Sequence, residues 1–297
     1  MKKLIITWVL LTAMIVAFTG CASGAPEAEG SASASASASA SASTSEQVKT
    51  VTARGADYVV SLVGEIAQTY MTANPGVKID TQANGSNKGI AMCADGTADI
   101  GLSARELKDI EKSTFVGMEQ KLLCSDGLAI AVSKDSKVSD LTAGQIKDIF
   151  MGTVSDWSEV GADAGAIHVY TMSSSSDIRK VFGTLFLGKN DKGEQIDTDD
   201  NMNTIKSTVE DMVTALEGDA AGIGSVPLSS LPAATLKALS VGGAAATSAN
   251  VAAGSYAYAL NYYILTRVPK QEASDFARYL FGSDAAAVLK GKGLTVK

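Results

Sequence analysis

Residues 48–103 carry the clearest signal of the fold: VKTVTARGADYVVSLVGEIAQTYMTANPGVKIDTQANGSNKGIAMCADGTADIGLS. Short β-type runs in it are followed by turns and then by apolar residues spaced three and four apart, which predicts alternating strands and helices. In chain order we expect strand 48–53, helix 59–71, strand 77–79, helix 89–94 and strand 100–102. This alternation indicates an α/β domain with a mostly parallel sheet.

Three polar loops follow the three predicted strands, beginning at Gly55, Gly85 and Ser103. Because parallel strands end at the same edge of a sheet, we expect these loops to lie together. Ligands of open α/β sheets bind outside the carboxyl ends of the strands, so this edge is the candidate binding site.

A second αβ region follows the first. We expect strands at 128–132, 167–170, 222–226 and 262–265, and helices at 141–150, 177–186, 208–217, 273–280 and 285–289. The chain has 297 residues, of which 46% are hydrophobic. At roughly 150 residues per domain this length suggests about two domains.

The composition excludes several classes of function. With 32 acidic and 25 basic residues the formal charge is -7, which argues against a nucleic-acid partner. One histidine and three cysteines leave little material for zinc sites or histidine-based triads. We find no P-loop, His-Glu-x-x-His or Cys-x-x-Cys motif, so we expect neither an enzyme nor a bound metal or other cofactor.

The N-terminal residues resemble a lipoprotein signal. Lys2 and Lys3 precede the apolar run 4–18, and the small residues Thr19 and Gly20 precede Cys21. This pattern predicts a signal peptide at 1–20 and acylation of Cys21. Residues 21–47 contain an alternating Ser-Ala tract that cannot build a core, so we expect a flexible linker. The folded part would then work outside the cytoplasm, close to the membrane.

Several short motifs stand in the order of a known family. They are Asn74-Pro75-Gly76-Val77, Gly96-Thr97-Ala98-Asp99-Ile100-Gly101, Ser103-Ala104-Arg105-Glu106-Leu107, Asp126-Gly127-Leu128-Ala129, Leu141-Thr142 to Ile149-Phe150, Trp157-Ser158-Glu159-Val160-Gly161 and Gly222-Ile223-Gly224-Ser225-Val226. From about Val48 to Lys297 the chain resembles the PstS-like phosphate-binding lipoproteins of bacterial phosphate ABC importers. The resemblance implies a type II periplasmic-binding-protein fold, with two α/β lobes joined by a hinge.

The resemblance also implies the domain limits and partners. Lobe I would comprise residues 48–127 plus 256–297, and lobe II residues 128–255. A cleft between the lobes would capture phosphate or a related oxyanion, and an ABC permease would receive it. We expect a monomer anchored to the membrane through Cys21.

The resemblance places the ligand on residues from both lobes. In lobe I these are Ala56, Asp57, Ser86 and Asp99, and in lobe II they are Ser174, Ser175 and Ser176. The hydroxyls and helix amides would donate to the oxyanion, and Asp99 would accept from a protonated phosphate oxygen.

This sequence departs from the family at two binding positions. Asp57 replaces a threonine, and Met172 stands where the family has a binding arginine. Arg54 and Lys88 could supply the missing positive charge. For Arg105 we expect a pairing with a nearby carboxylate, with a ligand role as the alternative.

Some alternatives stay open at this point. The serines at 173–176 could be a solvated loop that caps the helix at Asp177. Cys93 and Cys124 could form a disulfide or remain two buried thiols. The cleft could also be retuned to a cationic or neutral ligand, or the protein could be a sensing or degenerate lipoprotein without a transport role.

Overall fold

The computed structural model describes residues 48–296. The predicted signal peptide, Cys21 and the linker to residue 47 lie outside the described residues, as does Lys297. No helix within residues 48–296 is both long enough and apolar enough to cross a membrane.

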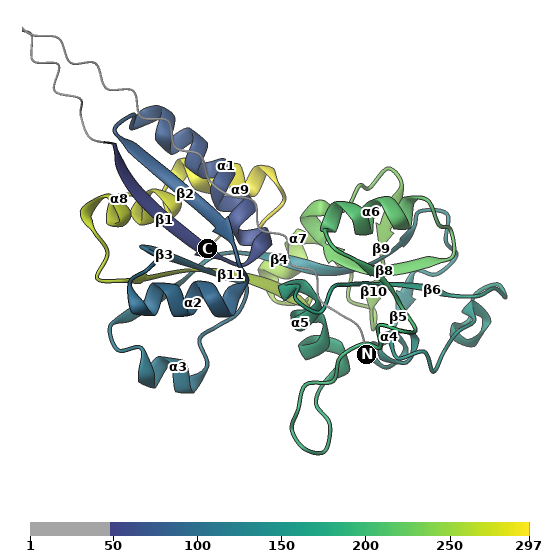
Figure 1. The fold of residues 1–297 in the computed structure, drawn as a ribbon. Helices are drawn as coiled ribbons and strands as arrows, with labels where there is room; N and C mark the ends of the chain where they lie inside the picture. The colour runs from purple at the N-terminus through teal and green to yellow at the C-terminus, as the bar shows by residue number, and fades with distance from the viewer. Residues whose placement is uncertain (1–47, 297) are drawn as a thin grey trace, which may run out of the picture. The chain divides into compact units, whose positions relative to one another are not determined.

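Lobe I is built on three neighbouring parallel strands (Figure 1). Its elements are β1 Lys49–Gly55, α1 Asp57–Ala73, β2 Val77–Ala83, α2 Ser86–Asp95, β3 Ile100–Ser103, α3 Asp109–Thr114, α8 Gln271–Leu280 and α9 Ser283–Gly291. Helices α1, α8 and α9 cover one face of these strands and α2 covers the other.

Lobe II is built around β6 and β8. Its elements are β5 Asp140–Leu141, α4 Ala143–Phe150, β6 His168–Met172, α5 Asp177–Phe182, β7 Thr204–Lys206, α6 Val209–Glu217, β8 Gly222–Pro227, β9 Leu236–Ala238, β10 Ser240–Val241 and α7 Ser248–Ala253. Helix α5 continues into a π-helical turn at Gly183–Leu187, so the helix expected over 177–186 changes its hydrogen-bond pattern halfway.

Two long strands join the lobes: β4, Met118–Ser133, and β11, Ala259–Arg267. Strand β4 pairs with β11 through Gly127 and with β8 from Leu128 onward. The main sheet of the described residues has the strand order β2-β1-β3-β11-β4-β8-β6-β7, with β9 also paired to β4. The partner of β4 therefore changes between Gly127 and Leu128. The residue limits of the lobes themselves stay a prediction.

The parallel strands expected within residues 48–103 are confirmed as β1, β2 and β3, but the sheet as a whole is mixed. Strands β1, β2 and β3 are parallel, but β11 is antiparallel to both β3 and β4, and β4 is antiparallel to β8. The sheet is mixed because the chain crosses between the lobes on β4 and returns on β11.

Apolar spacing accounts for α1 and its place in lobe I. Val59, Leu62, Val63, Ile66 and Tyr70 are buried along one face of the helix, as the spacing predicts. The chain then leaves the helix at Asn74, whose backbone N–H donates to the Met71 carbonyl. This face packs on the sheet and orients the first residues of α1, Asp57 and Tyr58, toward the site.

Candidate functional site

The loops after β1, β2 and β3 lie together, which confirms the expectation from the sequence. The backbone N–H groups of Asn84 and Gly85 both donate to the Gly55 carbonyl at 2.9 Å. The N–H of Ala56 donates to the Leu102 carbonyl at 3.0 Å. The N–H of Ala104 donates to Ser86 Oγ at 3.0 Å.

Two glycines place the first turn of α2 at this edge. Gly85 precedes the helix with φ of 81°, a conformation that L side chains rarely adopt. A Cβ on Gly89 would lie 2.5 Å from both the Arg54 carbonyl oxygen and the Gly55 Cα, so α2 approaches the end of β1 closely. Ser86, the first residue of α2, is only 1% exposed.

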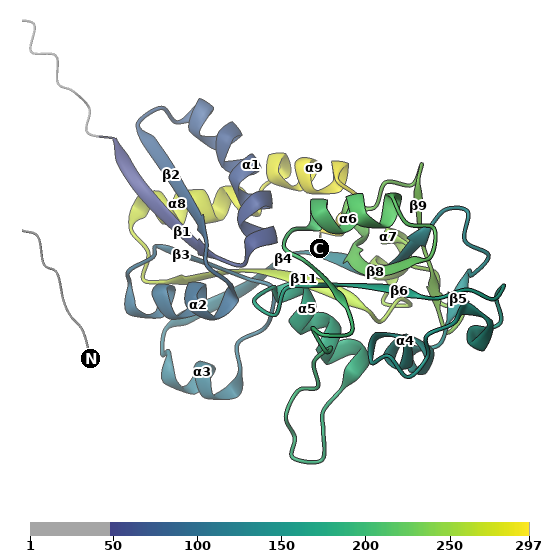
Figure 2. The ribbon, with the colours of Figure 1, turned by 45° about the vertical axis from the view of Figure 1, so that its right-hand side comes forward.

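A carboxylate from lobe II binds at this helix start. Asp177 Oδ2 accepts from the backbone N–H and from Oγ of Ser86, each at 3.0 Å. Asp177 is the first residue of α5, and both views show α5 next to α2 (Figure 1, Figure 2). Asp177 Oδ1 lies 3.5 Å from Lys180 Nζ, and the Asp177 side chain is 14% exposed. The N-terminus of α2 therefore already holds an anion, which comes from the protein itself.

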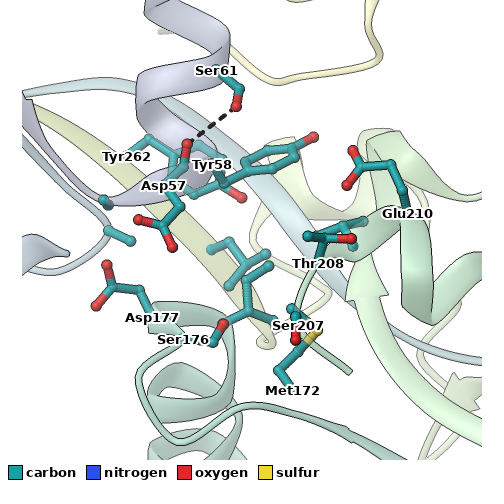
Figure 3. Close-up of a pocket in the computed structure, with 15 residues that line it drawn as sticks. Asp57, Tyr58, Ser61, Met172, Ser176, Asp177, Ser207, Thr208, Glu210 and Tyr262 are labelled. Atoms are coloured by element: carbon teal, nitrogen blue, oxygen red, sulfur yellow. Dashed lines mark hydrogen bonds between the residues drawn. The ribbon is translucent and has the colours of Figure 1, made fainter. Parts of the chain in front are cut away.

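Beside this contact lies a cavity of about 180 Å³ between the lobes. Its charged lining residues are Asp57, Asp177 and Glu210, and no basic residue lines it. Figure 3 shows Asp57 on α1 and Asp177 on α5 pointing toward one another, with Glu210 on the opposite side. Burial, and then the charge of Asp177, raise the pKa of Asp57 above its ordinary value, while Lys180 opposes the shift.

A second cavity, of about 420 Å³, adjoins the same group of residues. It is lined by Asp57, Asn84, Gly85, Asn87, Lys88, Ser175 and Lys180. The two lysines bring positive charge to the helix start that holds Asp177. Of the two residues predicted to supply charge, the structure thus brings Lys88 to the site.

The three predicted serines, Ser174, Ser175 and Ser176, differ in burial and in the cavity that they line. Ser176 is buried and lines the first cavity, together with Ala56 and Met172. Ser175 is exposed and lines the second cavity. Ser174 is exposed and lines neither of these two cavities.

Asp99 does not join this group. It precedes β3, so it lies at the amino end of that strand, whereas the site lies at the carboxyl end. Its Oδ2 accepts from the Thr52 N–H and Oγ1, each at 2.9 Å, and its Oδ1 lies 3.0 Å from Lys270 Nζ. Burial alone would raise the pKa of Asp99, but these partners lower it below its ordinary value.

The two arginines are held by carboxylates. Arg54 donates to Asp80 through Nη2 at 2.5 Å and lines neither cavity. Arg105 pairs with Glu111 through two nitrogens, each at 2.7 Å, and also donates to Asn87. The pairing expected for Arg105 is therefore confirmed, and it ties α3 to the first turn of α2.

A second contact between the lobes was not predicted from the sequence. Tyr58 of α1 hydrogen-bonds Ser229 Oγ at 2.7 Å and Ser230 Oγ at 3.1 Å. Ser229 Oγ in turn donates to the buried Asp126 of β4 at 2.5 Å. Asp177 was also missed as a site residue, because an acid at a helix start is equally typical of a simple capping position.

The cysteines within the described residues are two buried free thiols, Cys93 and Cys124. Cys93 Sγ donates to the Leu265 carbonyl at 3.5 Å. Burial raises the pKa of Cys93 to about 11 and that of Cys124 to about 12. Neither thiol faces the two cavities.

Solved structures share the fold of this chain. An ABC-type phosphate transport receptor from Vibrio cholerae superposes with a TM-score of 0.73 at 24% identity, covering 83% of this chain and 100% of that one. A putative phosphate ABC transporter substrate-binding protein with bound phosphate from Clostridium perfringens superposes with a TM-score of 0.73 at 24% identity. The match covers 84% of this chain and 100% of that one. At this identity the likeness shows the fold, which is that of a two-lobe type II periplasmic binding protein.

Sequence relatives show the family. The phosphate-binding protein PstS of Bacillus subtilis is 31% identical over 210 residues, which are 70% of this chain and 66% of that protein. The phosphate-binding protein PstS 2 of Streptococcus agalactiae is 36% identical over 110 residues, 37% of each chain. The matched stretches thus span under two thirds of these relatives' own length. The model of the PBP superfamily domain matches residues 37–284. The chain therefore belongs to the PBP (periplasmic-binding-protein) superfamily, and within it the protein is PstS-like.

Proposed function

We propose that this protein is an extracytoplasmic solute-binding lipoprotein that captures phosphate or a related oxyanion between its lobes and delivers it to an ABC permease. The proposal treats the protein as a binder and not as an enzyme. The relatives named as phosphate-binding proteins support it, as do the structures titled as phosphate transport receptors.

One observation carries the proposal: the start of α2 holds an anion that reaches it from the opposite lobe. Ser86 offers an N–H and an O–H to a single carboxylate oxygen at 3.0 Å each. Backbone N–H groups and the helix dipole favour negative charge at this place. A phosphate oxygen could accept the same two hydrogen bonds, with Lys88 and Lys180 nearby to balance its charge.

Asp57 takes the role that the sequence suggests for Asp99. It lines both cavities, whereas Asp99 accepts hydrogen bonds from Thr52 and lies 3.0 Å from Lys270 Nζ. Phosphate near neutral pH carries a proton that sulfate lacks, and a carboxylate can accept a hydrogen bond from it. We therefore expect Asp57 to favour phosphate over sulfate.

Calorimetric titration with phosphate and with sulfate tests this function. Asp57→Asn should lower the ratio of phosphate affinity to sulfate affinity by about tenfold, because a charge-assisted hydrogen bond is replaced by a neutral one. Asp211→Asn, which changes an exposed acid in the first turn of α6, is the matched control and should leave the ratio unchanged. Absence of phosphate binding in the wild type would refute the function, and an unchanged ratio in Asp57→Asn would refute the role of Asp57.

The acidic cavity favours a second candidate, a ligand with a positively charged organic group. Three carboxylates line this cavity without a basic residue, and the rings of Tyr58 and Tyr262 stand on its wall 5.4 Å apart between centroids. Carboxylates and aromatic rings both attract cations. Tetramethylammonium belongs in the same titration series, and binding of this cation without binding of phosphate would favour the second candidate.

A further inference from the structure

We propose that Asp177 is an internal ligand of the oxyanion site: it occupies the start of α2, closes the cleft without solute, and must be displaced before an external anion binds. The inference rests on the proposed function for the identity of that anion. It makes Asp177 a specificity-determining residue.

The contacts of Asp177 are those that a bound anion would make. One carboxylate oxygen accepts two hydrogen bonds from Ser86, and the other lies 3.5 Å from Lys180. The donor residue Ser86 is 1% exposed, so its N–H and O–H have little access to water in this arrangement. An external anion and Asp177 therefore cannot share these donors.

The contact also joins the lobes. Ser86 begins α2 of lobe I, and Asp177 begins α5 of lobe II, 91 residues later in the chain. In a hinged protein, a ligand closes the cleft by binding the closed state better than the open one. Asp177 is part of the chain, but its carboxylate favours the closed state in the same way, because it reaches Ser86 of the other lobe. The solute-free protein is therefore already closed.

Two consequences follow for an entering solute. Its apparent affinity equals its intrinsic affinity multiplied by the fraction of molecules in which Asp177 has left the site. It must also offer Ser86 and the lysines better bonds than a carboxylate does, which selects against simple carboxylates and in favour of oxyanions with more acceptor oxygens.

The test measures cleft opening and phosphate affinity separately. Nitroxides on Asp109→Cys of α3 and Asp191→Cys of lobe II, both exposed positions, report the interlobe distance in the detergent-solubilised full chain. In phosphate-free buffer, Asp177→Asn and Asp177→Gly should show a longer and broader distance than the wild type. Phosphate should restore the short distance and should bind both variants about tenfold more tightly than the wild type.

Asp211→Asn is the matched control, because it removes a charge from an exposed position of lobe II that lines neither of the two cavities. It should leave the solute-free distance short. If the Asp177 variants keep the wild-type distance, or if the wild type binds phosphate and the opened variants bind it no more tightly, the inference is overturned. If no protein in the series binds phosphate while the Asp177 variants alone open, the proposed ligand fails but the closing role of Asp177 stands.

Discussion

Asp126 is a buried acid at the point where β4 changes partner. It is 2% exposed, and it accepts hydrogen bonds from the N–H groups of Gly127 and Ser229 and from Ser229 Oγ. Burial raises its pKa from 3.8 to about 6, although these hydrogen bonds oppose the shift. Through Ser229 the residue also supports Tyr58, so its protonation is linked to a contact between the lobes.

The raised pKa of Asp126 predicts a pH-dependent stability with a definite sign. Between pH 3.8 and about 6 the folded protein keeps a proton that the unfolded chain has lost. The stabilisation is therefore fully present below pH 3.8 and is lost as pH rises through 6, a change of about 3 kcal/mol for about two pK units. The unfolding free energy of the wild type minus that of Asp126→Asn should fall by most of this amount from pH 4 to pH 7 in urea titrations.

Thr72→Ala, at an exposed residue that does not titrate, provides the comparison and should give a difference that does not vary with pH. A wild-type advantage over Asp126→Asn that grew with rising pH would contradict the assignment.

At the scale of elements, the site depends on how closely α2 approaches β1. Gly89 faces the Arg54 carbonyl and Gly55, with no room for a side chain. This close approach brings the first turn of α2 to the loops after β1 and β3. The position of Ser86 is thus set by the packing of a whole helix.

Gly89→Ala should destabilise the protein by about 1–3 kcal/mol, because the new methyl group would meet backbone atoms that cannot move aside. It should also weaken phosphate binding, since α2 must shift. Gly64→Ala on α1 is the control: its Cβ would meet nothing closer than 3.7 Å. That change should stabilise by about 0.5–1 kcal/mol, as expected for glycine to alanine within a helix. Urea denaturation measures the change in unfolding free energy of each variant. Equal changes in Gly89→Ala and Gly64→Ala would refute the packing argument.

At the scale of the whole molecule, the proposed function would require the folded lobes to stay close to a membrane permease. The prediction for residues 1–47 is a signal peptide, an acylated Cys21 and a Ser-Ala linker. Each buried methylene of an acyl chain contributes about 0.8 kcal/mol to membrane binding, so several chains on one cysteine would hold the protein stably.

Cys21→Ala should abolish metabolic labelling with radioactive palmitate and leave a precursor of lower mobility on gels. Cys93→Ala, which removes a buried thiol of lobe I, should keep full labelling and normal processing. Undiminished labelling of Cys21→Ala would rule out this anchor.

Local signals in the sequence predicted most helices and strands of lobe I and the edge of the sheet where the site lies. Apolar spacing predicted α1, and the polar loops at Gly55, Gly85 and Ser103 marked the carboxyl ends of three strands, because these signals are local. Family motifs added the two-lobe fold. Strand β4 was predicted only over 128–132, since its first half alternates in burial and pairs with the distant β11.

Which side chains meet depends on the tertiary structure. Asp99 and Asp57 are both acids beside short motifs, but one lies at the amino end of a strand and the other at the start of a helix on the opposite edge. Asp177 has the same local pattern as any helix-capping acid, and its partner Ser86 is 91 residues away. Such contacts depend on how two lobes close upon each other, and no local pattern of residues encodes that geometry.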